Sequence, residues 1–151
     1  MLFSPIHHTF APLGDRRQCL RALLMLCAPW RYRSGESRDI LREHLRTAFT
    51  AEAFLFSSGR SGLLAVLRAM KLQTGDEVIV QGYTCVVIPN AIHAAGGSPV
   101  YVDLDADTLN LDPEETAKAI TPRTRAIICQ HTFGIPADTE RLRALCDEHN
   151  I

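Results

Sequence analysis

The feature of this sequence that most limits its fold is a regular alternation of short apolar runs and helical segments after residue 50. The apolar runs lie at 53–56, at 77–81, within 96–104 and at 124–130, and the last three contain Val or Ile. Segments with helical periodicity follow them, at 62–72, 86–95, 112–120 and 138–149. Strands that are apolar along their whole length are typical of a parallel sheet buried on both faces, in which helices make the crossovers. The pattern therefore predicts an α/β fold, a mostly parallel sheet of four strands with flanking helices.

The part of the chain before residue 50 shows helical periodicity only. One helix is predicted from Asp15 to Ala28, where Pro29 ends it. A second helix is predicted from Arg38 to Phe49, with Ser37 as its N-cap. Its inner face is predicted to consist of the apolar residues at helical spacing, which are Ile40, Leu41, Leu45 and Phe49. Helices therefore precede the α/β part of the fold.

The change of pattern near residue 50 predicts a division of the chain. Residues 1–50 are expected to form an N-terminal helical segment, and residues 51–151 the α/β part. Residues 1–14 contain proline and glycine and are expected to be irregular, and the sequence RYRSGES at 31–37 is expected to be a linker.

The sequence SSGRSG at 57–62 stands where an apolar run gives way to a helix. The first N–H groups of a helix have no intrahelical partner, and the helix dipole favours an anion near them. Glycine permits a tight turn and a close approach to the backbone, and serine adds hydroxyl donors. The stretch is therefore either a phosphate cradle or a serine N-cap with a glycine turn that holds no ligand. The residues that would form the cradle are Ser58, Gly59, Arg60 and Ser61.

Further candidate site residues follow two of the predicted strands. Ligands bind at the carboxyl ends of the strands in an open parallel sheet, which makes Tyr83, Gln130 and His131 candidates. Tyr83 either stacks on a flat ligand or packs within its loop. His131 either contacts a ligand or only hydrogen-bonds to loop backbone.

Composition and cysteine spacing exclude several classes of protein. The net charge of −1 argues against a nucleic-acid binder held by bulk electrostatics. The apolar run after Arg16 and Arg17 is too short for a membrane span and is interrupted by Arg21, so no export signal is expected. The five cysteines are odd in number and lack C-x-x-C spacing. They predict reduced, mostly buried thiols in a cytoplasmic protein, with neither a disulfide framework nor a metal site.

Three segments, taken in order, resemble the DegT/DnrJ/StrS family. They are SSGRSGLLAVLRAM, GDEVIVQGYTCVVIPNAIHAAGGSPVYVDLDADTLNLDPEE and AITPRTRAIICQHTFGIPAD. The resemblance extends from about Phe49 to Ile151 and is weaker in the helices before it. It implies the large domain of a fold-type-I aminotransferase that depends on pyridoxal 5′-phosphate, many of which act on nucleotide-linked keto sugars.

The resemblance also implies roles for individual residues. Gly59, Arg60 and Ser61 stand where the family has the turn whose backbone amides hold the cofactor phosphate, with Arg60 in place of the usual threonine. Cys85 stands where the family often has an aromatic residue that stacks on the pyridine ring, and Tyr83 lies two residues earlier. His131 matches the family's His-x-x-Gly loop beside the cofactor.

Two essential groups of the family have no counterpart among these residues. The resemblance places the aspartate that pairs with the pyridine nitrogen, and the Schiff-base lysine, beyond Ile151. The lysines of this sequence are Lys71 and Lys118, and neither stands in a family-like setting. The expectation is an N-terminal piece of a sugar aminotransferase that is inactive alone, whose full-length relatives are homodimers acting on a keto sugar and an amino donor such as glutamate. The alternative is a non-catalytic domain that binds a phosphorylated ligand or pairs with a full-length paralogue. No nucleic-acid or membrane partner is expected.

Overall fold

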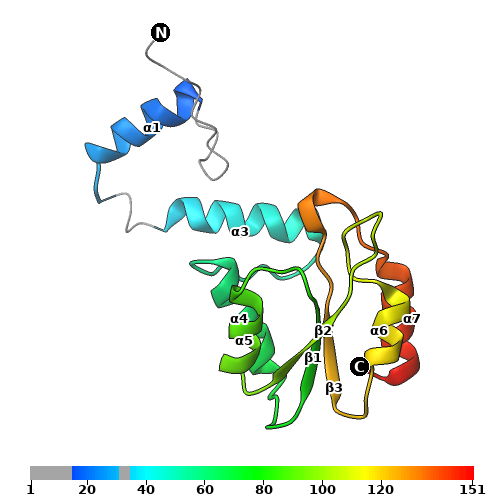
Figure 1. Ribbon diagram of the computed structural model, residues 1–151. Helices are drawn as coiled ribbons and strands as arrows, with labels where there is room; N and C mark the ends of the chain where they lie inside the picture. Colours follow the sequence, from blue (N-terminus) through cyan, green and yellow to red (C-terminus); the bar gives the residue numbers. More distant parts are fainter. Residues whose placement is uncertain (1–14, 31–34) are drawn as a thin grey trace. The chain divides into compact units, whose positions relative to one another are not determined.

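The computed structural model describes residues 15–30 and 35–151 (Figure 1). The chain divides into two compact units, Met1–Phe54 and Leu55–Ile151. The expected irregular structure of residues 1–14 and the first four residues of the expected linker, 31–34, lie outside the described residues.

The first unit contains two helices, α1 (Arg16–Leu26) and α3 (Glu36–Phe49). Asp15 caps α1 as part of a capping box, because its side chain accepts from the Gln18 N–H and the Gln18 side chain accepts from the Asp15 N–H. The predicted start of this helix is confirmed. The helix ends at Leu26, before the predicted stop at Pro29.

The start of α3 differs from the prediction. Its N-cap is Gly35, which has a left-handed backbone with φ of 74°, and not Ser37. The serine lies inside the helix, since the glycine lets the chain turn into the helix two residues earlier. The predicted inner face is also exposed in the described structure, where Ile40 is 64% and Phe49 75% accessible.

The second unit is built on a parallel sheet of three strands in the order β2-β1-β3. The strands are β1 (Glu77–Gln81), β2 (Ser98–Val102) and β3 (Thr124–Ile128). Ile79 of the central strand pairs with Val100 on one side and with Ile127 on the other. The predicted α/β class and parallel sheet are confirmed. The predicted strand at 53–56 is wrong, because that apolar run is irregular and pairs with none of the three strands.

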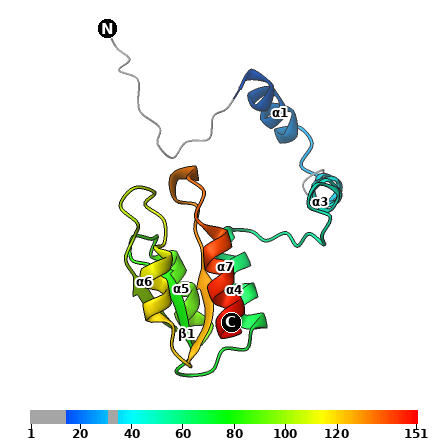
Figure 2. The ribbon, with the colours of Figure 1, turned by 90° about the vertical axis from the view of Figure 1, so that its right-hand side faces the viewer.

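Helices cover both faces of this sheet (Figures 1 and 2). On one face, α4 (Gly59–Ala69) and α5 (Val87–Ala94) pack on a cluster that includes Val78 and Val80. On the other, α6 (Pro113–Ala119) and α7 (Thr139–His149) lie over Ile79. Successive residues of β1 point to opposite faces and are fully buried, as expected for a central parallel strand.

The helices run antiparallel to the strands, so the start of each helix lies at the carboxyl edge of the sheet. The short 3₁₀ segment η1 (Thr132–Gly134), orange in Figures 1 and 2, follows β3 at the same edge. The carboxyl edge thus brings together the start of α4 and the loops after β1 and β3.

Polar contacts stabilise the amino edge of the sheet. Glu77, the first residue of β1, accepts from the guanidinium of Arg123 at 2.6 Å and from the hydroxyl of Thr121 at 2.5 Å. These donors precede β3, so the contacts hold the starts of two neighbouring strands together. The hydrogen bonds from Thr121 and then from Arg123 lower the pKa of the Glu77 carboxyl below its ordinary value of 4.5.

Glu77→Gln should flatten the acid side of the stability profile. A carboxyl whose pKa is lowered by folding stabilises the chain fully above its unfolded pKa, and this stabilisation is lost as the pH falls through the lower folded pKa. We therefore expect the free energy of unfolding to fall more steeply below about pH 4.5 in the wild type than in the variant. Urea titrations of both proteins at several pH values measure the difference, and parallel profiles would contradict it.

The cysteines differ from the prediction of mostly buried thiols. All five are free, and Cys19, Cys27 and Cys85 are exposed. The first two belong to α1 and its C-cap, which have no buried residue, and Cys85 lies in the turn after β1 and not in the strand. Cys129 and Cys146 are half-buried, and burial raises the pKa of both thiols.

Candidate functional site

The start of α4 lies at the carboxyl edge and is organised by Ser58. This residue is the N-cap, and its hydroxyl oxygen accepts from the Ser61 N–H at 3.3 Å and lies 3.0 Å from the Ser61 hydroxyl. The Gly62 N–H donates to the Ser58 carbonyl. The N–H groups of Gly59 and Arg60 have no acceptor among the described residues. The serine cap is therefore present, and it leaves two donors of the first turn available to an anion.

Gly59 and Gly62 serve different purposes in this turn. A Cβ on Gly62 would come within 3.3 Å of the Phe56 ring, so this glycine makes room for protein atoms. A Cβ on Gly59 would meet no other segment of the described chain within 4 Å, and the Gly59 backbone is not left-handed. The backbone at Gly59 therefore does not require glycine, and the predicted tight turn does not explain why glycine stands there. The space over its backbone is open, and an added Cβ would occupy it.

The Gln81 side chain joins the ends of β1 and β3. Its Nε2 donates to the Tyr83 carbonyl oxygen at 2.8 Å and to the Thr132 hydroxyl at 2.9 Å. Because the Tyr83 carbonyl can only accept, this contact fixes which end of the amide faces it. The Oε1 atom is buried and has no hydrogen-bond partner among the described residues. A buried acceptor in that state costs about 1–3 kcal/mol.

A second amide fixes the loop after β3. Asn110, which precedes α6 and is buried, accepts from the Thr132 N–H at 2.8 Å and donates to the Ile135 carbonyl at 3.0 Å. Between these two points Phe133 has a left-handed backbone, with φ of 55° and ψ of 19°. For a bulky residue this conformation is a genuine outlier. The amide therefore holds both ends of a strained segment.

The strained segment presents an aromatic ring. Phe133 is 73% accessible, and its ring centroid lies 6.2 Å from that of Tyr83, with 43° between the planes. Tyr83 is itself 62% accessible. A third contact, from the Thr84 hydroxyl to the Gln130 side chain, also joins the two loops. Hydrogen bonds from the end of β1, from the loop before α6 and between the loops after β1 and β3 thus hold the segments that carry the two exposed rings.

His131 is engaged with its own loop. Its Nδ1 accepts from the Ala137 N–H at 3.0 Å, which in a neutral imidazole leaves the proton on Nε2. Of the two alternatives that the sequence left open for His131, contact with a ligand or a hydrogen bond to loop backbone, the structure shows the hydrogen bond to backbone.

The structure brings only some of the predicted site residues together. Ser58 and Ser61 share hydrogen bonds, and Tyr83 is tied to the loop of His131 through Gln81 and Thr132. No hydrogen bond among the described residues joins the turn at 58–61 to Tyr83 or Cys85, and what they share is the sheet edge. Sequence reasoning missed Gln81, Asn110 and Phe133. A glutamine at the end of an otherwise apolar strand was a usable signal for Gln81.

The two lysines lie at the opposite edge of the sheet. Lys71 stands between the end of α4 and the start of β1, and Lys118 is in the last turn of α6, which leads into β3. Lys118 donates to Glu115 at 2.6 Å, and this partner raises the pKa of its amine. A lysine held in its charged form is a poor nucleophile toward an aldehyde.

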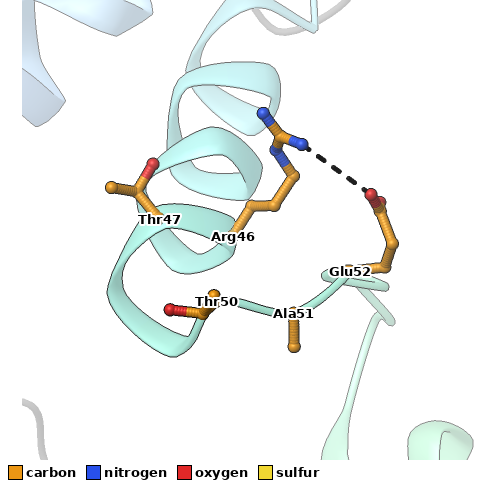
Figure 3. Close-up of a pocket in the computed structure, with 5 residues that line it drawn as sticks. All are labelled: Arg46, Thr47, Thr50, Ala51 and Glu52. Atoms are coloured by element: carbon orange, nitrogen blue, oxygen red, sulfur yellow. Dashed lines mark ion pairs between the residues drawn. The ribbon is translucent and has the colours of Figure 1, made fainter.

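A hollow of about 430 Å³ belongs to the first unit (Figure 3). It lies at the end of α3 beside an ion pair in which Arg46 and Glu52 are 3.9 Å apart. Its lining consists of Arg46, Thr47, Thr50, Ala51 and Glu52. None of the candidate site residues lines it, so it is not part of the candidate site.

Two searches of the described residues found nothing further. Residues 15–30 and 35–151 hold no group of three or more His, Cys, Asp or Glu side chains arranged for a metal ion. In the same ranges, no helix has both the length and the apolar character that crossing a membrane requires.

Comparison with known proteins places this architecture among aminotransferases. The model of the DegT/DnrJ/EryC1/StrS aminotransferase family matches residues 25–151. DesV of S. venezuelae, solved in complex with a ketimine intermediate, is 44% identical over 62% of this chain, with a TM-score of 0.60. The aminotransferase from Psychrobacter cryohalolentis is 27% identical over 93% of this chain, with a TM-score of 0.81. The protein ntda from Bacillus subtilis, with bound cofactor pmp, is 31% identical over 75%, with a TM-score of 0.72.

These solved structures are much longer than the present chain. It spans 25% of the DesV chain, 36% of the Psychrobacter chain and 26% of the Bacillus chain. The likeness therefore concerns one region of each relative.

Proposed function

Because the chain belongs to the DegT/DnrJ/EryC1/StrS aminotransferase family, whose cofactor is pyridoxal phosphate, we propose that the start of α4 holds the phosphate of that cofactor. The observation that carries the proposal is the open space at Gly59 beside two N–H groups that have no acceptor in the part of the chain that the structure describes. Backbone amides at a helix start bind a phosphate dianion through hydrogen bonds and through the helix dipole. Ser58 and Ser61 add hydroxyl donors, and Arg60 adds a positive charge next to them.

The ring of the cofactor belongs, in this proposal, with the loops after β1 and β3. Tyr83, Cys85 and His131 lie in these loops, at the same edge as the cradle. When bound, pyridoxal phosphate supplies an aldehyde that takes up an amino group and a ring that withdraws electrons. The residues of this chain bind and orient the group, and none of them is placed to move a proton on it.

The family supports a proposal for the activity of the whole protein. We propose amino transfer from an amino acid such as glutamate to a nucleotide-linked keto sugar, by a cytoplasmic homodimer. Support comes from relatives described as sugar aminotransferases, among them proteins of Streptococcus pneumoniae and Micromonospora echinospora.

Residues 1–151 by themselves should bind the cofactor without transferring amino groups. Both lysines lie at the amino edge, away from the cradle, and Lys118 is held by Glu115. Neither amine is therefore placed to react with an aldehyde whose phosphate sits at the start of α4. This placement also favours a second candidate function, a non-catalytic module that binds a phosphorylated ligand.

Titration of the 151-residue chain with pyridoxal 5′-phosphate, followed by borohydride reduction and peptide mapping, tests the proposal. We expect saturable binding and no stoichiometric adduct at Lys71 or Lys118. Absence of saturable binding would remove the cofactor role. A single-site adduct at either lysine would overturn the expectation that the isolated chain is inactive. Equal affinity for inorganic phosphate and for pyridoxine 5′-phosphate would favour the phosphate-binding module.

A further inference from the structure

Two features of the carboxyl edge are unfavourable for folding and lie next to each other. Gln81 buries an acceptor that has no partner among the described residues, and Phe133 has a left-handed backbone with an exposed ring. An apolar residue in place of Gln81 would remove the buried acceptor, and a glycine in place of Phe133 would remove the backbone strain. Unfavourable local features of this kind cluster at ligand sites, where the surrounding structure maintains them.

The hydrogen bonds of this edge converge on two aromatic residues. Gln81 donates to the carbonyl of Tyr83 and to the hydroxyl of Thr132, the residue before Phe133. Asn110 holds the backbone on both sides of Phe133, at Thr132 and Ile135. The two amides come from the end of β1 and from the loop before α6. What they position in common is the pair of exposed rings, whose centroids are 6.2 Å apart.

We propose that Gln81 and Asn110 are positioning residues that hold Tyr83 and Phe133 as an aromatic surface for the planar ring of the phosphorylated ligand. The inference rests on the proposed function, since it takes the phosphate to lie at the start of α4. It adds Phe133 as a ring contact and gives the two buried amides a role in binding. Exposed aromatic faces of this kind stack on flat, electron-poor rings.

Gln81→Glu separates a positioning role from a structural one. A buried carboxylate cannot donate to the Tyr83 carbonyl, whereas a protonated carboxyl can, and burial raises the pKa of such a group. The probe is pyridoxine 5′-phosphate, which has no aldehyde and cannot react with amines. Relative to the wild type, we expect affinity to be at least about tenfold weaker near pH 8 and to recover to within about threefold near pH 5. Every ionisable group other than the side chain at position 81 is present in both proteins, so its effect cancels in the ratio.

Inorganic phosphate serves as the probe that has no ring. Its ability to compete with pyridoxine 5′-phosphate should depend on the cradle alone, so its inhibition constant should be the same in Gln81→Glu and in the wild type at both pH values. Glu77→Gln is the matched control at the other end of β1. It weakens the fold and should leave the affinity for pyridoxine 5′-phosphate unchanged.

Phe133→Gly gives a second test that does not depend on the glutamine. Glycine adopts the left-handed backbone without strain, so the variant should be as stable as the wild type or more so, while affinity for pyridoxine 5′-phosphate falls at least about fivefold. A loss of stability with unchanged affinity would overturn the proposal, as would a pH-independent ratio for Gln81→Glu. If the wild type itself binds no pyridoxine 5′-phosphate, the proposed function fails first, and the two failures are thereby distinguished.

Discussion

Gly59→Ala should weaken the binding of pyridoxine 5′-phosphate by at least about tenfold and leave the fold as stable as before. The new methyl group would occupy the open space over the first turn of α4, where it would contact no other segment of the described chain within 4 Å. It would keep a phosphate oxygen from the N–H groups of Gly59 and Arg60. Because the Gly59 backbone is not left-handed and alanine favours helices, the folded chain has no reason to lose stability.

Gly75→Ala is the matched control for this variant. Gly75 lies in the turn before β1, and it too has nothing within 4 Å of an added Cβ, but its φ is +95°. Alanine is strained there, so this variant should lose stability and keep its affinity. Isothermal titration gives the affinities and thermal unfolding gives the stabilities. Unchanged affinity in Gly59→Ala would show that the phosphate is bound elsewhere.

Ile79→Ala should lower the free energy of unfolding by about 2–5 kcal/mol. Ile79 is fully buried in the central strand, and it packs with Val102, Leu111 and Leu142 beneath α6 and α7. Truncation removes apolar contact and leaves a cavity that the rigid centre of a parallel sheet cannot close.

Urea unfolding of Ile79→Ala and of Val66→Ala measures this effect against a surface control. Val66 is 59% accessible on α4, and its truncation should change the free energy by less than about 0.5 kcal/mol. A similar small change in Ile79→Ala would mean that the isolated chain does not form the described core.

The elements that local pattern specifies were predicted well. The strand at 77–81 and its flanking helices follow from β-branched runs and helical spacing. The run at 53–56 shows the limit of this reasoning, because a short apolar run becomes a strand only where a neighbouring strand pairs with it. The cap at Ser37 was lost to Gly35, whose left-handed backbone is not visible in a pattern of polar residues.

The candidate site was predictable only where its contacts are local. The proposed cradle involves residues within one turn of α4, so sequence reasoning could predict it. The contact of Gln81 with Thr132 spans 51 positions, and that of Asn110 with Thr132 spans 22. Such contacts depend on which strands become neighbours in the sheet, and the alternation of elements alone does not fix that order.

The contacts of Glu77 stabilise the edge of the sheet opposite the candidate site, and this has a consequence for engineering. Its ion pair and hydrogen bonds lie at the amino edge, one strand length away from Gln81 and the cradle. Substitutions at this edge, and in the turn at Gly75, can tune thermal tolerance without redesign of the ligand-binding end. A library of variants confined to 73–77 and 121–125 would therefore select for thermal stability. A separate library at the carboxyl edge would select for ligand specificity.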